Sequence, residues 1–532
     1  MSTYIKTYLK KEVNISQAIP GRSKEMKKNL AGGMSFKADK WIALRRWLLT
    51  GSMTNLYHQN STQMTELNIE LLSECVKIDA IKVAEEILYA SSKGLSNHTP
   101  LLALVYLSMG EFVAKKKFRD IFNTIVRTGS HLYEFFSYCK ALRGFGKTIH
   151  KAVGSWLDSR DAKELEYQFL KYQQRDGWSA RDVLRLMKPK TEDEAKNFVY
   201  KWAVGKADRM NELYAPRITV YESLKKDKKW SDDEVVSFIN EYNLTHEMIP
   251  ANIKRTTPIW EALYHKMPVG ATIRNLGNLT DKGVFSNLSN INILEKRLSK
   301  EVLSKGRVHP LTIANAYKVY ANGCGIRGNL SWNVIPRICD ALEEAIETAF
   351  DVIEPTNKVF YHALDISPSM KSGNVGNLMM TPREIEAIMA LTSIRSEKNY
   401  FVGGFASDFI ELSDFRKTMS FSNALEFFIL RSRGWGGTNA ASAYKYATYN
   451  KIYADVFVFW TDSESWMGGH PAQALAEYRE KVNKNAKAIY VTLTAYGDHI
   501  SLVDPKDSNS YDLAGFSSET PKLIQLIAKG DL

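Results

Sequence analysis

The spacing of apolar residues changes once along this chain, near residue 355, and this change constrains the fold more than any other feature. Before it, apolar residues recur every three or four positions in one segment after another, for example in 37–49, 130–143 and 335–350. No clear strand pattern interrupts these segments. We therefore expect an all-α region of stacked helix pairs, which is an α-solenoid.

Three hydroxyl residues are predicted to cap helices in this region. Thr65 precedes ELNI, Thr191 precedes EDEA and Ser231 precedes DDEV. A hydroxyl oxygen at such a position accepts a hydrogen bond from a free backbone N–H of the first helical turn.

After residue 355, short apolar runs alternate with helical segments. This alternation predicts a parallel sheet covered by helices on both faces. The chain is therefore expected to be a multidomain protein, with an all-α domain at 1–354 and an α/β domain at 355–532. The strand-like runs are 358–367, 399–407, 455–465 and 486–495.

Small side chains that carry oxygen follow two of these strand-like runs. Asp365, Ser367 and Ser369 form a D-x-S-x-S motif after the first run, and Asp462 lies at the end of a later one. Thr438 lies on a glycine-rich loop that enters a helix. Ligands of parallel sheets bind at the carboxyl ends of the strands, and oxygen donors without sulfur or nitrogen suit Mg²⁺, Mn²⁺ or Ca²⁺. The alternative is that these residues only cap helices.

The excess positive charge lies entirely in the first part of the chain. Residues 1–350 hold 53 basic and 38 acidic residues, a balance of +15, whereas residues 351–532 hold 18 basic and 21 acidic residues, a balance of −3. This distribution favours contact between the helical region and a polyanion. The alternative is that the lysines only increase solubility.

Cysteine content and hydropathy indicate the compartment. The four cysteines form no CxxC pair, which is typical of a reducing compartment and gives no zinc site. The first residues lack the apolar core of a signal peptide, and no apolar run approaches the roughly 18 residues that a membrane span requires. We therefore expect a soluble cytoplasmic protein without membrane contact.

The densest basic stretch lies between residues 143 and 190. On a helix through 161–175, Lys171 and Arg175 lie four residues apart and share a face. The next predicted helix repeats this spacing, and two adjacent helices with such cations suit a phosphate backbone. The candidate RNA-binding residues are Arg143, Lys147, Lys171, Arg175, Arg181, Arg185 and Lys188.

Two structural alternatives stay open for this basic stretch. Trp178 could stack on an unpaired base, but packing at the corner between the two helices is the preferred interpretation. The cations could instead pair with the acidic residues close to them in sequence, which are Glu164, Asp176 and Asp182.

The order D-x-S-x-S, then threonine, then aspartate resembles the metal-ion-dependent adhesion site of von Willebrand factor A-type domains. The resemblance covers roughly 355–532 and implies a Rossmann-like domain that binds Mg²⁺ or another hard divalent cation. Such domains generally bind partners through the metal and are not catalytic. The ligands implied are Asp365, Ser367, Ser369, Thr438 and Asp462.

Nearly the whole chain resembles the Ro autoantigen (TROVE-domain) family, and most of all its bacterial branch. A phage-encoded copy would show the same features. The segments that carry the resemblance are KYQQRDGWSARDVLR at 171–185, VRTGSHLYEFFSYCKALRGFGKTIHKAV at 126–153, IRNLGNL at 273–279, KGRVHP at 305–310 and IPRICDALEEAIETAF at 335–350.

This family resemblance implies a specific architecture and function. HEAT-like helical repeats are expected to close into a ring with a basic central hole, and the A-type domain is expected to join the two ends of the ring. Single-stranded 3′ ends of misfolded RNA would thread the hole, while small structured Y-like RNAs would bind the outer surface. The protein would act as a monomer in RNA quality control or processing, together with a 3′-to-5′ exoribonuclease.

The resemblance extends to some RNA-binding residues and not to others. Lys171 and Arg175 match family positions implicated in Y RNA contact. Animal members carry histidines in the segments where this chain has Ala180 and Met187-Lys188, so a histidine contact is not expected here. Lys188 is expected to keep a phosphate contact.

Two other functions have to be distinguished from RNA binding. One is a metal-dependent protein-adhesion scaffold without RNA function, and the other is a metal-dependent nuclease. Nuclease sites generally need more clustered acids than the loops here offer. GFGKT at 144–148 is not a phosphate-binding loop, because Ala141 stands where the first glycine of that motif is required. A non-catalytic RNA-binding protein is therefore expected.

Overall fold

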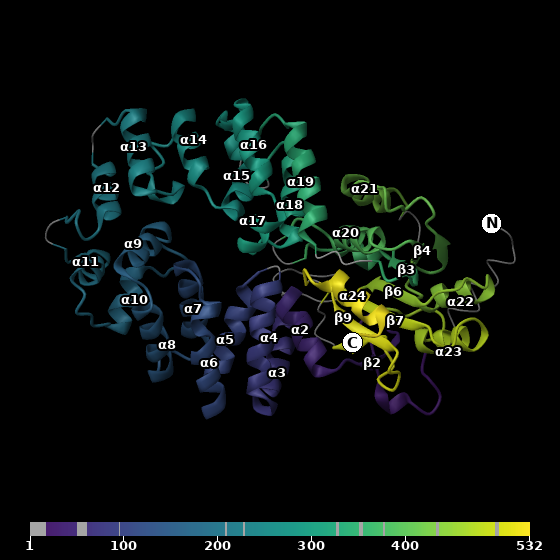
Figure 1. Ribbon diagram of the computed structural model, residues 1–532. Coiled ribbons are helices and arrows are strands. Elements are labelled where there is room, and N and C mark those ends of the chain that lie inside the picture. The colour runs from purple at the N-terminus through teal and green to yellow at the C-terminus, as the bar shows by residue number, and fades with distance from the viewer. Residues whose placement is uncertain are drawn as a thin grey trace.

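The computed structural model describes most of the chain, and its described ranges show a helical body followed by an α/β lobe. In Figure 1 the helices from α2 to α8 form one row, those from α9 to α13 form a turn, and those from α14 to α19 form a second row. The described ranges are 17–50, 61–94, 96–207, 210–226, 229–325, 329–350, 355–375, 378–431, 436–494, 499–515 and 517–531.

The helices of the body are short, and their apolar sides pack against neighbouring helices to form one continuous core. The first row comprises α2 (Lys40–Thr50), α3 (Ser61–Ile78), α4 (Ala80–Lys93), α5 (His98–Met109), α6 (Phe112–Ile125), α7 (Gly129–Leu142) and α8 (Lys147–Asp158). The turn comprises α9 (Ala162–Lys171), α10 (Ala180–Met187), α11 (Glu194–Ala203), α12 (Pro216–Leu224) and α13 (Asp232–Tyr242). The second row comprises α14 (Thr257–Lys266), α15 (Val269–Asp281), α16 (Leu288–Arg297), α17 (Lys300–Lys305), α18 (Pro310–Ala321) and α19 (Pro336–Ala349).

One of the three predicted helix caps is confirmed. Ser231 accepts a hydrogen bond from the backbone of Glu234 and forms a full capping box at the start of α13. The prediction for Thr191 is wrong by two residues, since Asp193 caps α11. The prediction for Thr65 is also wrong, because α3 already begins at Ser61.

The C-terminal lobe contains a six-stranded sheet in the order β5-β4-β3-β6-β7-β9. All neighbours run parallel except β5, which pairs antiparallel with β4 at one edge. The expected parallel sheet is therefore confirmed apart from this edge strand. The strands are β3 (Val359–Asp365), β4 (Asn399–Phe405), β5 (Phe409–Glu411), β6 (Val456–Thr461), β7 (Lys487–Thr492) and β9 (Ser510–Ala514).

Helices cover both faces of this sheet. Alternate residues of β3 show the two faces, because Phe360 belongs to the same apolar core as α20, α21 and α24, whereas Tyr361 packs in a second core with α22 and α23. The helices are α20 (Pro382–Arg395), α21 (Phe421–Arg431), α22 (Ala441–Tyr449), α23 (Pro471–Lys481) and α24 (Thr520–Lys529).

A hairpin near the N-terminus corrects the expectation that no clear strand precedes residue 355. β1 (Met26–Lys28) pairs with β2 (Met34–Lys37), and β2 pairs with β8 (Ile500–Ser501) of the C-terminal lobe. These strands are three, four and two residues long, which is too short for a hydrophobic alternation to be recognised.

The C-terminal lobe contacts both ends of the helical body. At the first end, Arg46 of α2 forms an ion pair with Asp512 of β9, and both side chains are about 95% buried. At the second end, Lys318 of α18 forms an ion pair with Glu384 of α20 at 2.5 Å. The body and the lobe therefore form a closed circuit (Figure 1), as the family resemblance implied.

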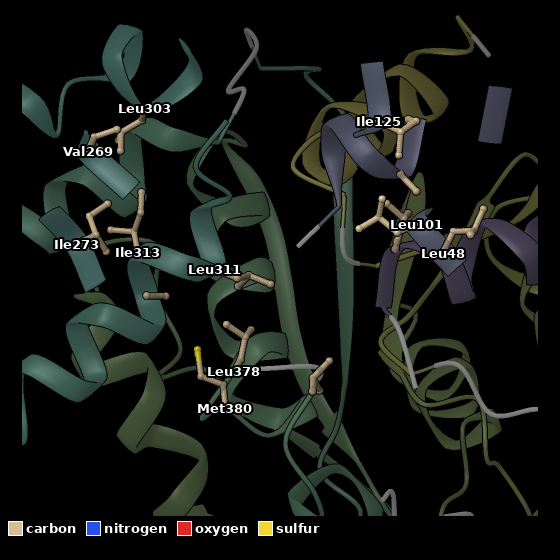
Figure 2. Close-up of a cluster of buried hydrophobic side chains, with 14 of the residues drawn as sticks. Leu48, Leu101, Ile125, Val269, Ile273, Leu303, Leu311, Ile313, Leu378 and Met380 are labelled. Carbon is tan, nitrogen blue, oxygen red and sulfur yellow. The ribbon is translucent and has the colours of Figure 1, made fainter. Parts of the chain in front are cut away.

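Apolar contacts support this closure. Figure 2 shows Leu311 of α18 above Leu378 and Met380 of the lobe, all within the same buried core. Leu101 and Ile125 of the first row belong to this core as well. Within the described ranges, each helix is too short or too polar to traverse a lipid bilayer.

His362 of β3 is expected to make the stability of the protein sensitive to acid. Its ring is fully buried, and burial lowers its pKa from 6.5 to about 3. Between these two values the unfolded chain binds a proton that the folded chain does not, so stability is expected to fall as the pH drops below about 6.5, by up to about 1.4 kcal/mol per pH unit. Denaturant unfolding at a series of pH values should show that the free energy of unfolding of His362→Gln depends less on pH. An unchanged pH dependence of the free energy of unfolding would contradict this role of His362.

Candidate metal centre and nucleic-acid interface

Three loops meet at the carboxyl edge of the central strands. After β3 ends, the backbone N–H of Ile366 donates to the carbonyl of Phe405 at the end of β4, at 2.9 Å. The N–H of Asn439 donates to Ala406 at 2.7 Å, and the carbonyl of Thr438 accepts from Trp466 at 2.9 Å. The loops that carry Asp365, Thr438 and Asp462 are thus joined by backbone hydrogen bonds.

Two buried carboxylates within this junction repel each other electrostatically. Asp365 is fully buried, and it accepts hydrogen bonds from Ser367 N at 3.0 Å and from Thr461 Oγ1 at 2.7 Å. Asp462 is also buried and accepts from Glu464 N at 2.9 Å. Burial, and then the charge of Asp462, raise the pKa of Asp365 to about 7.

The three hydroxyl residues that were predicted as metal ligands are buried as well. Ser367 Oγ and Ser369 Oγ are 3.1 Å apart, and Thr438 is buried as well. Two carboxylates in a buried site repel each other without a counter-ion, and a hard divalent cation would relieve that repulsion while the neighbouring hydroxyls supply further oxygen ligands. The five predicted ligands therefore fit Mg²⁺, Mn²⁺ or Ca²⁺.

Two residues of α20 support the first loop, and the sequence did not identify them. Glu386 accepts a hydrogen bond from the backbone N–H of Asp365 at 2.6 Å, and Arg383 donates to the carbonyl of Ser367. Both side chains are buried, and burial raises the pKa of Glu386 well above its usual value. The available signal was a group of three charged residues, Arg383, Glu384 and Glu386, at the start of a mostly apolar helix.

Backbone strain also marks the loop after β6. Ser463 has a φ of 69°, which is the left-handed region that side chains other than glycine rarely adopt. It follows Asp462 directly, and its Oγ lies 3.0 Å from Thr492 Oγ1.

The N-terminal hairpin covers this loop, because Asn29 Nδ2 donates to Ser465 O at 2.7 Å.

Gly437 permits the position of Thr438. It has a φ of 86°, and a Cβ at this residue would lie 2.0 Å from Met467 Sδ. Gly437→Ala is expected to lower the free energy of unfolding by about 1–3 kcal/mol and to weaken binding of Mn²⁺, because the loop must move. Gly436→Ala is the matched control, since Gly436 has open space around it. Thermal unfolding and Mn²⁺ titration that do not distinguish the two variants would contradict this role.

Lys171 and Arg175 lie at the end of α9 and in the turn after it. Lys171 Nζ contacts the rings of Tyr167 and Tyr172 and donates to Tyr167 Oη at 3.1 Å. Arg175 is exposed, and its nearest acid is Asp176 at 3.8 Å, a long contact between two exposed groups that is worth little. Within the part of the chain that the structure describes, neither cation is therefore held in a strong ion pair.

The other predicted cations divide into two kinds. Lys147, Arg181, Arg185 and Lys188 are exposed and have no ion pair among the described residues. Arg143, by contrast, donates to Ser108 Oγ at 2.7 Å and so stabilises the end of α5. This contact gives Arg143 a structural explanation.

Several other cations of the body hold helix ends in the same way. Arg127 donates to the carbonyl of Ser91 at 3.4 Å, and Arg297 donates to the carbonyl of Tyr264 at 2.7 Å. Carbonyls of a last helical turn have no partner within the helix, so a cation there is favourable. Part of the basic excess thus stabilises the helical repeat itself.

Trp178 fills a corner between helices, as preferred from the sequence. Its ring packs against Phe136 at 5.2 Å and Phe145 at 5.5 Å in edge-to-face contacts. Lys140 Nζ lies 5.9 Å from the centre of the same ring. The packing accounts for this tryptophan without a nucleic-acid base.

Positive charges from the turn of the body, from the segment after it and from the second row gather around His246, in the short 3₁₀ turn after α13. Burial lowers the pKa of His246 first, the neighbouring Glu247 opposes this, and the charges of Lys254, Lys171 and Arg274 lower it further. Lys171 belongs to the turn of the body and Arg274 to the second row. The sequence did not identify Lys254 or Arg274, because it does not show which cations the fold brings together.

Comparison with known proteins gives matches over nearly the whole chain. A family model described as the TROVE domain matches residues 27–236 and 240–319, and one described as the Ro60 vWA domain matches 360–528. The RNA-binding protein RO60 of Deinococcus radiodurans is 30% identical over 517 residues, which cover 95% of this chain and 96% of that protein. The RNA-binding protein RO60 of Caenorhabditis elegans is 26% identical over 95% of this chain and 90% of its own length.

A solved structure agrees with the fold. The crystal structure of the Deinococcus radiodurans RO (RSR) protein superposes with a TM-score of 0.67 at 29% identity, and the match covers 93% of this chain and 100% of that one. The predicted fold class, a helical-repeat body followed by a von Willebrand A-type domain, is thereby confirmed.

Proposed function

Because the chain belongs to the Ro60 family of TROVE-domain proteins, we propose that it is a non-catalytic, cytoplasmic RNA-binding protein. Two relatives named RNA-binding proteins match it over nearly their whole length. The observation that carries the proposal is the clustering of Lys171, Lys254 and Arg274 around His246. Cations from separate parts of one body suit a phosphate backbone that passes between them.

The finer proposal has two RNA ligands. Single-stranded 3′ ends of misfolded RNA enter between the two rows of helices, and a small structured Y-like RNA binds the outer surface through the exposed cations near Arg175. The exposed positions Arg181, Arg185 and Lys188 extend this second surface. The protein then acts in RNA quality control or processing, as a monomer that works with a 3′-to-5′ exoribonuclease.

The proposal includes a hard divalent cation in the C-terminal lobe. Asp365, Ser367, Ser369, Thr438 and Asp462 would hold Mg²⁺, Mn²⁺ or Ca²⁺. Once bound, the ion would supply a coordination position for a carboxylate of a protein partner. The buried, mutually repelling pair of carboxylates supports this assignment.

RNA binding is expected to be electrostatic. The logarithm of the affinity for a single-stranded oligonucleotide should fall with the logarithm of salt concentration by about 0.7 for each phosphate neutralised. Lys171→Ala combined with Arg175→Ala should weaken binding of a small structured Y-like RNA at least tenfold and make its salt dependence shallower, because two phosphate contacts are lost. Fluorescence anisotropy at several salt concentrations measures both, and circular dichroism shows whether the variant is folded.

The control for this experiment is Lys481→Ala combined with Lys484→Ala, which removes two exposed lysines from the C-terminal lobe. Its affinity should equal that of the unchanged protein. A flat salt titration, or equal losses in both double variants, would favour the protein-adhesion scaffold instead. That alternative also predicts purified protein free of nucleic acid, which ultraviolet absorbance reveals.

A further inference from the structure

A small cavity lies where the two rows of helices meet beside the C-terminal lobe. Its volume is about 280 Å³. Its walls come from the end of α4, from α17 and the turn into α18, from the end of α19, and from Ser518 ahead of α24. The cavity thus touches the first row, the second row and the lobe at once.

One guanidinium group lines this cavity, and a second lies behind its wall. Arg307 lines the cavity, and Arg127 is bound to Ser91, next to the lining residue Ser92. Burial, and then the charge of Arg307, lower the pKa of Arg127 to about 10. Among the described residues, neither Arg127 nor Arg307 forms an ion pair with a carboxylate.

Glu519, which follows the lining residue Ser518, is already engaged in an ion pair. Glu519 forms an ion pair with Lys93 at 2.7 Å, and Lys93 is the cation that the end of α4 contributes to the cavity. The remaining polar groups on the wall include the hydroxyls of Ser92 and Ser304. The cavity is therefore lined by hydrogen-bond donors with excess positive charge.

The backbone of Arg307 gives a separate reason to expect a role for its side chain. This residue follows α17 with a φ of 51°, in the left-handed region. A glycine adopts that conformation without strain and is the residue that helix ends of this kind favour. The turn alone does not explain an arginine at this position.

We propose that this cavity, lined by Arg307 and Lys93, binds a phosphate group. The oxygens of a tetrahedral anion match the planar donors of the Arg307 guanidinium, and the anion offsets the positive charge of the cavity wall. Because Lys93 belongs to the first row and Arg307 to the second, the bound anion holds the two rows together. The phosphate comes either from inorganic phosphate or from the backbone of a single-stranded RNA.

Arg307→Gly tests this site with little cost to folding. Calorimetric titration of the full chain with inorganic phosphate, at constant ionic strength set by sodium chloride, should show one site per chain. Arg307→Gly should weaken that binding at least tenfold, while its melting temperature without phosphate should not fall. Lys451→Gly is the matched control, since Lys451 is also a basic residue with a positive φ, 53°, and lies in the C-terminal lobe.

A second arm separates the two sources of phosphate. If inorganic phosphate does not bind, the affinity of a single-stranded oligonucleotide should still be at least tenfold lower for Arg307→Gly than for Lys451→Gly. The proposal is overturned if neither ligand distinguishes these variants. In that case, RNA binding that still depends on Lys171 and Arg175 would leave the proposed function intact.

Discussion

Arg46→Ala is expected to lower the free energy of unfolding by about 3–5 kcal/mol, because it leaves a buried charge without its partner. The guanidinium of Arg46 forms an ion pair with Asp512 and also donates to the carbonyl of Ile500 at 3.2 Å. Both charged side chains are about 95% buried. Water therefore cannot replace the missing partner at the carboxylate of Asp512.

The location of this pair gives the substitution a second effect. Arg46 lies on α2, at the beginning of the helical body, whereas Asp512 lies on β9, near the end of the chain. The pair thus connects the two ends of the closed circuit. Arg46→Ala should make the junction between α2 and the lobe more susceptible to limited proteolysis than the rest of the protein.

Two further variants test whether burial of the Arg46–Asp512 ion pair causes the loss of stability. Denaturant unfolding of Arg337→Ala should show little change, because the ion pair of Arg337 with Glu295 is exposed. Combining Arg46→Met with Asp512→Leu should recover most of the lost stability, since no unpaired charge remains. Equal effects of Arg46→Ala and Arg337→Ala would contradict the assigned importance of this junction.

The sequence predicted the central strands of the lobe well, because their signal is local. Each of β3, β6 and β7 is an apolar run buried on both faces, and nothing in the helical body resembles it. Because this signal is local in the sequence, Asp365 and Asp462 could also be placed at strand ends. Their role as metal ligands remains a prediction.

Features that depend on distant parts of the chain could not be predicted in this way. The hairpin of β1 and β2 exists as part of a three-stranded sheet with β8, which lies more than 450 residues further on. Glu386 supports Asp365 through a contact between α20 and the end of β3, and in the sequence it is simply one of several charged residues of a helix. Such partners become visible only when the elements are assembled.

The roles of individual charged residues could not be predicted from the sequence either. The sequence located the positive excess in the helical body, but it could not separate Arg143, which stabilises the end of α5, from Arg175, which is exposed. Arg127 and Arg307 are 180 residues apart, yet the charge of Arg307 lowers the pKa of Arg127. Counting cations therefore indicates a polyanion partner without showing which cations contact it.

Asp365→Ala is expected to abolish binding of Mg²⁺ and Mn²⁺, with affinity reduced at least 100-fold, while RNA binding stays largely intact. Asp365 is the first residue of the D-x-S-x-S motif, and the negative charge of Asp462 acts on its carboxylate. Losing it removes one of only two charged ligands. The basic residues around His246 lie in the helical body, so the RNA affinity should not change. Calorimetry with Mn²⁺ and anisotropy with an oligonucleotide measure the two effects.

The metal should also stabilise the fold, and this gives a readout independent of any partner. At a cation concentration 100 times the dissociation constant, binding to the folded state contributes about 2.7 kcal/mol, so chelation should lower the melting temperature of the unchanged protein. Asp365→Asn should not respond to chelation. Asp455→Asn, which removes a carboxylate at the opposite end of the sheet where Asp455 accepts from Val359 N at 2.9 Å, should respond as the unchanged protein does. If Asp365→Asn keeps the cation-dependent shift, these residues are helix caps and the ion binds elsewhere.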